Sequence, residues 1–422
     1  MSAFLSTLPS TWDITRLDRV ATVNARIGWK ALTAAEYQPD GYAFLSTPNI
    51  KGVDIDFDNV NYISEFRYRE SPELQLQEGD VLLTKDGFTL GTVNVVTKLP
   101  RPATVNGSIA VLRPFGIDPR FLRYVIASNA IQHHMWAAKN GMDVLHLFQR
   151  DIKKIPLPLP PQDEQRRIAD FLDTETARIA LLASTQRRLV SKLKEREGAA
   201  VECILSEVSS SQVRLKHLLT YPPSYGANES AEHDRRDWPR YIRTTDITEG
   251  GSLRDATFAS LPPHVARNYM LNDGDLLFVR SGATVGKSFA YESTFGPAAH
   301  AGYLIRARVD TARSNSRLIW HFCQTQSYWQ QISEGTTQAT IQNVNAEKYG
   351  NLLVPMISRE QQQPTLVRLD HAVAKSGSLK SRAVHLLSLL DERRQALITA
   401  AVTGQFDVST ASGRNVTDGV SA

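Results

Sequence analysis

Cysteine is scarce in this chain of 422 residues, and long apolar runs are missing from it. The two cysteines, Cys203 and Cys323, cannot form a disulfide framework. The first residues lack the basic segment and apolar run of a secretory signal, and no stretch approaches the roughly 18 apolar residues that span a bilayer. We therefore expect a protein of the reducing cytoplasm that has no membrane partner.

A strong charge of one sign is also lacking. The formal net charge is only +4, and basic and acidic side chains nearly balance in residues 1–160. Bulk charge therefore neither requires nor excludes an anionic partner such as nucleic acid. The length allows two or three domains, and the 42% hydrophobic and 22% charged contents are those of an ordinary folded protein.

Catalytic motifs are missing as well, because we find no nucleophile elbow, zinc-binding helix or nuclease-like carboxylate cluster. Ser281–Ser288 resembles a phosphate-binding loop, but three residues separate its glycines where four are required. Its counterpart Gly87–Gly91 is not followed by a lysine, so we interpret both as structural turns. Thr220–Tyr225 resembles the amine-gripping loop of amino methyltransferases without the amide or acid before the prolines. We predict no catalytic residues and no metal ligands.

Three aspartates, Asp54, Asp56 and Asp58, alternate along a strand predicted over Gly52–Phe57. Alternation would place their carboxylates on one face, where they could hold a cation. No fourth ligand lies nearby in the sequence. We therefore favour a solvated strand face over a cation site.

What the chain does contain is a long helical pattern from Pro161 to about Cys203. Its apolar residues recur at alternating three- and four-residue steps, which is the heptad pattern of a coiled coil. They are Ile168, Leu172, Ile179, Leu182, Leu189, Leu193, Ala200 and Cys203. Glu175, Gln186 and Arg196 interrupt this stripe, and charged residues crowd the other faces. A helix this polar needs a partner helix.

The two halves of the chain also repeat each other. Under a constant shift, Glu78–Gly91 aligns with Asp273–Gly286, so that both contain Gly-Asp followed by Gly-x-Thr-x-Gly. Similar shifts align Leu45–Ile50 with Ile242–Ile247, and a helix that includes Phe121 with a later one that includes Leu318. The preserved order indicates duplicated domains.

The second repeat also ends in a heptad helix. Its core positions are Leu366, Leu369, Val373, Ala383, Leu387, Leu390, Leu397 and Ala401, interrupted by Ser376, Lys380 and Arg394. Two such helices most simply bury their stripes on each other in an antiparallel, intramolecular coiled coil, and each would span roughly 60 Å. We hypothesise that Glu175, Gln186 and Arg196 face Lys380, Arg394 or a docked partner.

These patterns predict an α/β (α+β) fold in which two duplicated globular domains are separated by the paired helices, with pseudo-twofold symmetry. The predicted boundaries are residues 1–160 for the first domain, 161–205 for the first helix, 206–358 for the second domain and 359–403 for the second helix. Residues 404–422 would form a short docking segment and a partly disordered tail.

The loops of both domains contain cationic, amide and aromatic side chains suited to phosphate contact and base-edge recognition. In the first domain these are Arg26, Trp29, Lys30, Lys51, Lys85, Arg101 and Lys139. In the second they are Tyr225, Asn228, Arg235, Arg236, Arg240, Arg243, Arg280, Lys287, Thr337, Gln338 and Gln342. For any single residue, an ordinary solvated loop is the alternative.

The paired Gly-Asp-(Val/Leu)-Leu and Gly-x-Thr-x-Gly elements, together with Ile155–Gln165 leading into a helix, resemble the specificity subunit of type I restriction-modification enzymes. The likeness extends to about residue 406. The second junction, Leu352–Gln362, departs by losing prolines, and Pro364 lies just inside the helix, which puts the first turn of that helix in doubt. The resemblance implies two target-recognition domains, each of which reads one half of a bipartite double-stranded DNA site with a fixed spacer.

The resemblance also implies partners: two methyltransferase (M) subunits docked on the helices and, in the full complex, restriction (R) subunits. Those partners would bind S-adenosylmethionine, ATP and Mg, and this chain would bind no cofactor. A different class of function, an interaction scaffold whose duplicated domains bind proteins, stays open at this point. Steep salt dependence of binding would distinguish DNA from an apolar protein interface. A third possibility, a nucleotide-binding enzyme, rests only on the imperfect loop at Gly282–Ser288.

Overall fold

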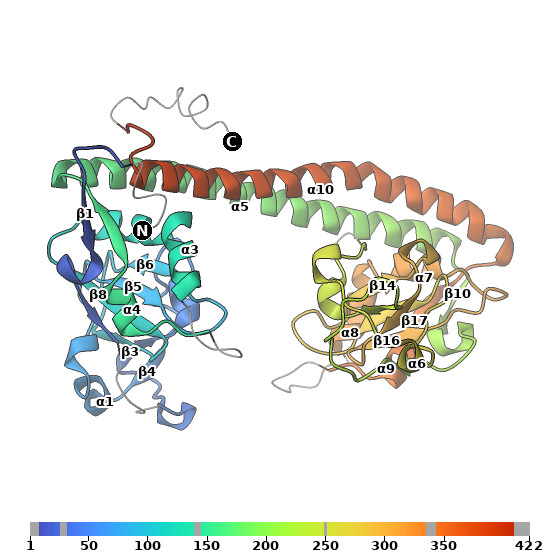
Figure 1. Ribbon diagram of the computed structural model, residues 1–422. Coiled ribbons are helices and arrows are strands. Elements are labelled where there is room, and N and C mark those ends of the chain that lie inside the picture. The colour runs from blue at the N-terminus through green and yellow to red at the C-terminus, as the bar shows by residue number, and fades with distance from the viewer. Residues whose placement is uncertain (1–7, 26–31, 139–144, 249–250, 335–342, 409–422) are drawn as a thin grey trace. The chain divides into compact units, whose positions relative to one another are not determined.

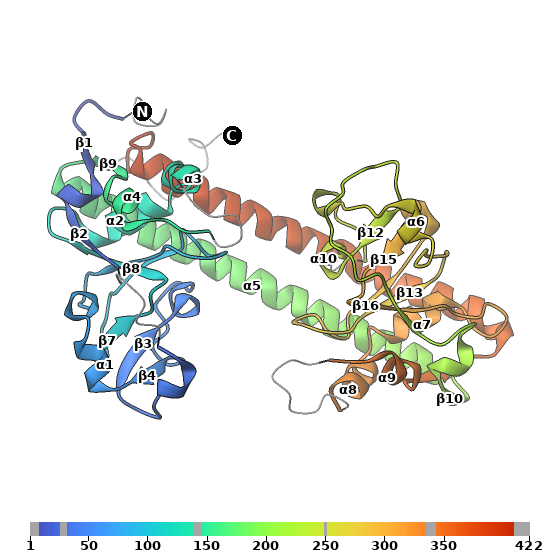
Figure 2. The same ribbon diagram turned by 60° about the horizontal axis from the view of Figure 1, so that its bottom comes forward.

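The computed structural model describes residues 8–25, 32–138, 145–248, 251–334 and 343–408. The chain divides into two compact units, the first made of residues 1–185 and 386–422 and the second of residues 186–385. Both divisions fall inside the long helices α5 (Gln162–Val208) and α10 (Arg359–Val402), so each unit has a globular part and a portion of both helices (Figures 1 and 2). In the described part of the chain, no helix is long and apolar enough to cross a membrane.

The globular part of the first unit combines three small sheets with short helices. Its strands are β1 (Asp13–Arg16), β2 (Ala21–Asn24), β3 (Tyr42–Leu45), β4 (Asn61–Ile63), β5 (Val81–Thr84), β6 (Val93–Val95), β7 (Ala103–Val105), β8 (Ile109–Pro114) and β9 (Pro156–Leu159). Its helices are α1 (Glu65–Arg69), α2 (Pro119–Ala127), α3 (Asn129–Ala138) and α4 (Gln149–Lys153). The sheet orders are β2-β8-β5-β6, β4-β3-β7 and β1-β9, and only the β3–β7 pair is parallel.

The globular part of the second unit repeats this plan. Its strands are β10 (Ser211–Arg214), β11 (Ser224–Tyr225), β12 (Arg240–Ile242), β13 (Leu276–Val279), β14 (Ser288–Ala290), β15 (Ala298–His300), β16 (Leu304–Ala307) and β17 (Leu353–Met356). Its helices are α6 (Pro263–Ala266), α7 (Ser316–Phe322), α8 (Gln326–Glu334) and α9 (Ala346–Gly350). The sheets β11-β16-β13-β14 and β10-β17 match β2-β8-β5-β6 and β1-β9, and the parallel β12–β15 pair matches β3–β7, whereas β4 has no equivalent strand in the described part of the second unit.

The repeated Gly-Asp pair starts the central strand of each main sheet. Asp80 is buried and receives two hydrogen bonds from Arg113, at 2.8 and 2.9 Å, and Asp275 receives two from Arg308, at 2.8 and 2.7 Å. Each aspartate also accepts a backbone N–H from the turn before it, at 2.8 Å. Bidentate arginine–carboxylate pairs fix the relative orientation of the two side chains and also neutralise the buried carboxylate. The duplication that the sequence indicates is therefore present in individual contacts.

The Gly-x-Thr-x-Gly element that follows is a tight turn in both units. Gly87 and Gly282 have φ of 80° and 90°, and Gly91 and Gly286 have φ of 90° and 85°. Gly286 N–H donates to the carbonyl of Val279 at 3.0 Å, as Gly91 N–H does to Thr84 at 2.9 Å. Positive φ values favour glycine because a Cβ atom would clash with the backbone. The repeated glycines thus have a structural cause, and the interpretation as turns is confirmed.

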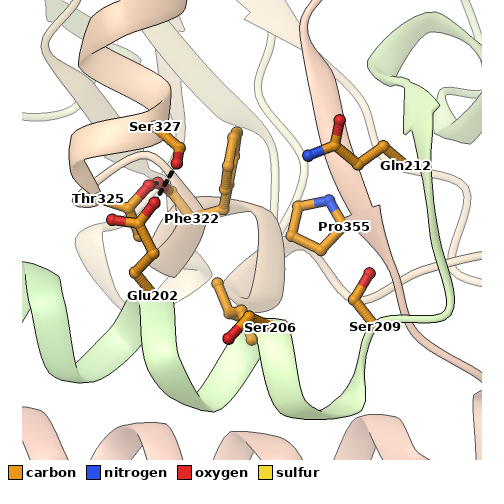
Figure 3. A pocket seen from close by; sticks show the side chains of 9 residues that line it. Glu202, Ser206, Ser209, Gln212, Phe322, Thr325, Ser327 and Pro355 are labelled. Atoms are coloured by element: carbon orange, nitrogen blue, oxygen red, sulfur yellow. Dashed lines mark hydrogen bonds between the residues drawn. The ribbon is translucent and has the colours of Figure 1, made fainter.

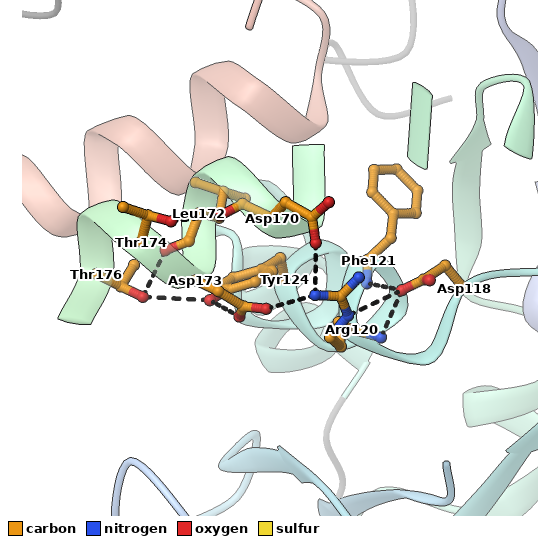
Figure 4. A network of polar contacts seen from close by, with 9 residues as sticks. All are labelled: Asp118, Arg120, Phe121, Tyr124, Asp170, Leu172, Asp173, Thr174 and Thr176. Atoms are coloured by element: carbon orange, nitrogen blue, oxygen red, sulfur yellow. Dashed lines mark hydrogen bonds and ion pairs between the residues drawn. The ribbon is translucent and has the colours of Figure 1, made fainter. Parts of the chain in front are cut away.

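A polar network ties the globular part of the first unit to α5 (Figure 4). Arg120 of α2 donates to Asp170 at 2.7 Å and to Asp173 at 2.9 Å, and the hydroxyl of Tyr124 donates to Asp173 at 2.6 Å. Burial, together with the hydrogen bond to Asp173, raises the pKa of Tyr124 to about 12. In the second unit, Asp370 of α10 occupies the matching place and contacts Arg317 and His321 of α7.

The two long helices pack antiparallel, as predicted. In the first unit, Leu172 and Ile179 of α5 share a core with Leu390 and Leu397 of α10. In the second unit, the end of α5 shares a core with the start of α10, which places Leu366 in contact with the opposite end of α5. Along α10 the predicted heptad is confirmed, because every apolar position assigned to it is buried or half-buried, including Val373 and Leu387.

On α5 the predicted stripe is wrong at three positions, Leu182, Leu189 and Cys203, which are all exposed. Leu182 and Leu189 are 54% and 42% exposed, Leu193 is half-buried, and Ala183 is buried in place of Leu182. The inward positions of α5 advance in 11-residue steps, from Ile168 to Ile179, Val190 and Val201. Such a repeat corresponds to about 3.67 residues per turn, whereas a heptad corresponds to 3.5. A heptad template therefore drifts off the inward face after a few turns.

The same drift changes the partner of Lys380. Its ammonium contacts the carboxylate of Glu197 at 2.5 Å, and the hydroxyl of Ser376 also donates to Glu197. The hypothesis that Arg196 or Glu175 faces Lys380 is wrong, because Arg196 is exposed and Glu175 pairs with Arg178 on its own helix. Polar groups do meet inside the seam, but one residue later than the heptad indicates.

Several smaller sequence predictions can also be compared with the structure. Gly52–Phe57 forms no strand, and Asp56 instead accepts backbone N–H groups of Asp58 and Asn59, so its carboxylate shapes a turn. No cluster of three or more His, Cys, Asp or Glu side chains in the described ranges could hold a metal ion.

Helix α10 begins at Arg359 and is continuous through Pro364. After it, Phe406 packs on Phe171 with ring centroids 5.5 Å apart, and residues 409–422 of the predicted tail lie outside the described residues.

The seam yields a charge-swap prediction. Glu197→Lys places a second ammonium against Lys380 in a half-buried position, so it lowers the free energy of unfolding by about 1–3 kcal/mol. The double variant Glu197→Lys, Lys380→Glu restores most of that loss. Arg196→Glu, one position away on the exposed face, changes stability by no more than about 0.5 kcal/mol. Urea unfolding of the four proteins measures this, and equal losses at 196 and 197 contradict the seam.

The turn yields a second prediction. An alanine at Gly282 has open space, so Gly282→Ala adds only backbone strain of about 1–2 kcal/mol. An alanine Cβ at Gly286 would lie 2.7 Å from Cζ3 of Trp329 and 3.1 Å from Cγ2 of Ile332. Overpacking adds about 1–3 kcal/mol there. Thermal unfolding should therefore rank Gly286→Ala below Gly282→Ala, and the opposite ranking would show that the packing of α8 against the turn is wrong.

Candidate nucleic-acid interface

Equivalent cationic residues stand at the end of the central strand in each unit. Lys85 follows β5 and Arg280 follows β13, directly before the glycine turns. The carbonyl of Lys85 accepts the N–H of Leu147 at 2.9 Å, and that of Arg280 accepts the N–H of Val344 at 2.8 Å. These bonds bring the segment before α4, or before α9, beside the turn. Each unit therefore has a surface built from one turn and one loop, which we call the turn-loop surface.

On the turn-loop surface of the first unit, charged and aromatic side chains are in contact. Asp86 pairs with the ammonium of Lys85 at 2.9 Å and with the Nδ1 atom of His146. The His146 ring stands edge-on to Phe148, with centroids 4.5 Å apart, and the guanidinium of Arg150 lies 4.9 Å from the centre of the Phe148 ring. Arginine over an aromatic ring is held with its donors directed outward.

On the turn-loop surface of the second unit, an arginine is stacked on a tyrosine. The guanidinium of Arg280 lies 4.9 Å from the centre of the Tyr225 ring, and the Tyr225 hydroxyl accepts the N–H of Ala346 at 3.2 Å. The Nε atom of Arg280 is buried and has no hydrogen-bond partner in the described structure. Lys287, on the same turn, is half-buried. A half-buried guanidinium stacked on an aromatic ring is of the kind that meets an acceptor such as a phosphate or a base edge.

A second basic cluster lies in the loop before and after β12. Arg235 lies 4.6 Å from the centre of the Trp238 ring, and Arg236 lies 4.0 Å from that of Phe258. Both arginines are exposed, although Arg235 also pairs with Asp237. Arg240 is 8% exposed and donates to the carbonyl of Arg254 at 2.5 Å, so it is a buried part of the cluster that holds the loop after β12 in place. Exposed arginines on aromatic faces suit contact with nucleic acid.

Arg243, which the sequence predicts among the DNA contacts, makes its described hydrogen bonds within the fold. Its Nε and one terminal nitrogen donate to the carboxylate of Asp246, at 3.1 and 2.9 Å, and the same terminal nitrogen donates to the carbonyl of Thr257. Ser46 has the equivalent place in the first unit, where its N–H and hydroxyl donate to Asn49. The position caps a short helical turn in both repeats.

The remaining predicted contacts are not gathered at one place. Lys85 is 7% exposed and is occupied by Asp86, and Arg101 pairs with Asp40 at 2.8 Å and stacks on Tyr62. Lys51 and Asn228 are exposed. Seven predicted residues lie outside the described residues and keep the status of predictions: Arg26, Trp29, Lys30, Lys139, Thr337, Gln338 and Gln342.

The sequence motifs that approached enzyme motifs have packing roles. The N–H groups of Val285, Gly286 and Lys287 bond to carbonyls of the same turn and strand, so they are not directed at a phosphate. Pro223 packs on α9, where a Cβ at Gly350 would meet its Cγ atom at 3.5 Å. Figure 3 shows a hollow of about 110 Å³ lined by Glu202 of α5 and Phe322 of α7. Pockets that take cofactors usually exceed about 300 Å³.

Buried ionisable groups in the second unit are separate from these surfaces. Burial lowers the pKa of His300 to about 4, so the ring is neutral near pH 7, and its Nδ1 atom lies 3.1 Å from the carbonyl of Tyr269. Burial also raises the pKa of the Cys323 thiol, which keeps it protonated. Neither arrangement activates a nucleophile.

Sequence reasoning missed His146, Phe148, Arg150 and Phe258. The first three follow residues 139–144, which lie outside the described residues, and they reach the turn through the contact of His146 with Asp86 and the backbone bond from Leu147 to Lys85. The sequence did contain a signal for these residues. Asp86-Gly87 marks a turn, and the duplication predicts that the same segment of each domain lies beside that turn. Phe258 is separated from Arg236 by β12 and the segment after it, and no local sequence pattern connects the two residues.

Comparisons with known proteins agree with this architecture. Residues 9–190 match the family model described as type I restriction modification DNA specificity domain. The chain is 19% identical to the StySPI specificity subunit of Salmonella potsdam and 19% identical to the EcoKI specificity subunit of Escherichia coli strain K12. Each match covers 94% of this chain and 90% of the relative.

A chain from a solved structure of a type I restriction-modification system superposes with a TM-score of 0.56 at 16% identity, covering 94% of this chain and 99% of that chain. At this identity, the superposition shows a shared fold. The family model, the relatives matched over nearly their whole length, and the duplicated domain-helix plan lead to the same assignment. Residues 9–190 are a type I restriction-modification DNA specificity domain, and over nearly its whole length the chain is similar to the specificity subunits of type I restriction-modification systems.

Proposed function

We propose that each globular part recognises one half of a bipartite double-stranded DNA site and that the paired helices set the unread gap between the halves. The chain is the DNA specificity subunit and is not itself an enzyme, since catalysis in type I systems belongs to partner subunits. The observation that carries the bipartite proposal is the repeated turn-loop surface, with a cation at the end of the same strand in each unit.

In this proposal Arg280 and Tyr225 contact a base edge or a phosphate in the second half-site. Arg235 and Arg236 are exposed cations stacked on aromatic rings, and they would position the duplex by contacting its phosphates. Arg150 on Phe148 plays the equivalent part in the first half-site. Phosphate contacts position a protein, whereas base contacts give the sequence preference. The predicted loop residues at 26–30, 139 and 337–342 would extend these contacts.

The proposed partners are two methyltransferase (M) subunits and, in the full complex, restriction (R) subunits. S-adenosylmethionine, ATP and Mg would be bound by those subunits. Exposed apolar side chains on the long helices support a docking role, since such residues are costly in water unless a partner covers them. They are Leu181, Leu182, Leu189, Val367, Leu379, Val384, Leu386 and Leu389.

A scaffold that binds only proteins explains the loops of the globular parts less completely. It gives no reason for the arginines that stack on Tyr225, Trp238 and Phe258 in polar loops. Protein interfaces are centred on apolar groups and are depleted of charge at their core. The described loops have the opposite character.

Exchange of one domain tests the bipartite proposal. We expect methylome sequencing of cells that express the complete system to show two short motifs at one fixed spacing. Replacing residues 1–160 with the equivalent segment of a relative should change one motif and leave the other motif and the spacing intact. Modification of a single uninterrupted motif would contradict the proposal.

Two arginines of the second unit provide a matched pair. Arg280→Ala should weaken DNA binding by about 1–3 kcal/mol, with relaxed preference at one position if the contact is to a base edge. It should leave urea unfolding nearly unchanged. Arg243→Ala should do the reverse, lowering the free energy of unfolding by about 1–3 kcal/mol because Asp246 loses its partner while buried. Equal DNA affinity of wild type and Arg280→Ala would remove Arg280 from the interface.

A further inference from the structure

Phe88, at the tip of the first glycine turn, is 95% exposed, the largest value among the large apolar side chains described. Single exposed apolar residues are common and need no explanation on their own. The exposure of Phe88 does need an explanation because of the residues around it. The side chain stands on the turn-loop surface of the first unit, two residues after Asp86, whose carboxylate contacts His146.

The turn holds Phe88 in a fixed place. On one side, the N–H of Gly87 donates to the carbonyl of Leu145 at 2.8 Å, and on the other, Leu90 is buried and donates its N–H to Gly87 at 3.1 Å. The backbone around Phe88 is therefore anchored at both ends. An aromatic ring displayed on an anchored turn loses little conformational entropy when it binds.

The duplication provides an internal control for a structural role. In the second unit, Ala283 occupies the position of Phe88, and Val285 N–H donates to the carbonyl of Gly282 at 3.1 Å just as Leu90 does to Gly87. The two turns have nearly the same glycine φ values. The turn consequently forms with a methyl group at this position, so its fold does not require the ring.

We propose that Phe88 inserts its ring against a base step in the first half-site and partly unstacks it, so that this half is recognised by DNA deformability as well as by base edges. The inference rests on the proposed function. Apolar wedges of this kind open a step and kink the duplex, at a cost that depends on the sequence. The neighbouring cation Arg150 favours DNA over a protein partner, whose contact surface would be mostly apolar, and the carboxylate of Asp86 is paired with Lys85 and His146.

The test uses the complete methyltransferase complex and its own recognition duplex, with 2-aminopurine placed in turn at each base of the first half-site. Wild type should increase the fluorescence at one step. Phe88→Ala should abolish that increase and weaken binding by about 5- to 100-fold, whereas Phe88→Trp should retain both. Because no charge is removed, the salt dependence of binding should keep its slope.

Phe115→Ala is the matched control, because Phe115 is 65% exposed but lies at the opposite end of β8 from the turn. Its fluorescence and affinity should equal those of wild type. If wild type binds its bipartite site and Phe88→Ala behaves identically, the wedge is wrong and the proposed function stands. If Phe88→Ala instead fails to assemble with the methyltransferase subunits, Phe88 is a protein contact. A wild-type complex without a bipartite site would overturn both proposals.

Discussion

Each long helix depends on the other for a place to bury its apolar stripe. Helices α5 and α10 are mostly polar, and an isolated helix of this composition would be only marginally stable in water. Their shared cores at Leu172 with Leu397, and at Leu205 with Leu369, therefore stabilise both helices and the globular parts that rest on them. The Glu197–Lys380 pair adds a polar contact that disfavours a shifted register, as single polar positions do in coiled coils.

The globular parts separate a common frame from variable surface positions. The Asp80–Arg113 and Asp275–Arg308 pairs, the glycine turns and the strand order are the same in both. Position 88 has phenylalanine where its equivalent has alanine, and the tyrosine beneath Arg280 has no described equivalent beneath Lys85. A frame fixed by buried ion pairs and backbone bonds allows the exposed tips to differ, because their side chains contribute little to folding.

Sequence patterns could predict this architecture where the determinants are local or repeated. The duplication, the glycine turns and the heptad of α10 depend on spacing along the chain, and all three are present. The stripe of α5 was predicted correctly only as far as Ile179, because a straight helix and a heptad diverge slowly and nothing local distinguishes Leu182 from Ala183. The bracing role of Arg243 was missed for another reason: its partner Asp246 is close in sequence, but only the fold shows that the pair is used for capping.

The division of the chain has a consequence for its biosynthesis. The second unit is one continuous segment, residues 186–385, whereas the first combines residues 1–185 with residues 386–422. Leu172 and Ile179 gain their partners Leu390 and Leu397 only when the last part of the chain has left the ribosome. The domain that is translated first is therefore the one completed last, and until then its apolar stripe on α5 lacks the partner residues of α10.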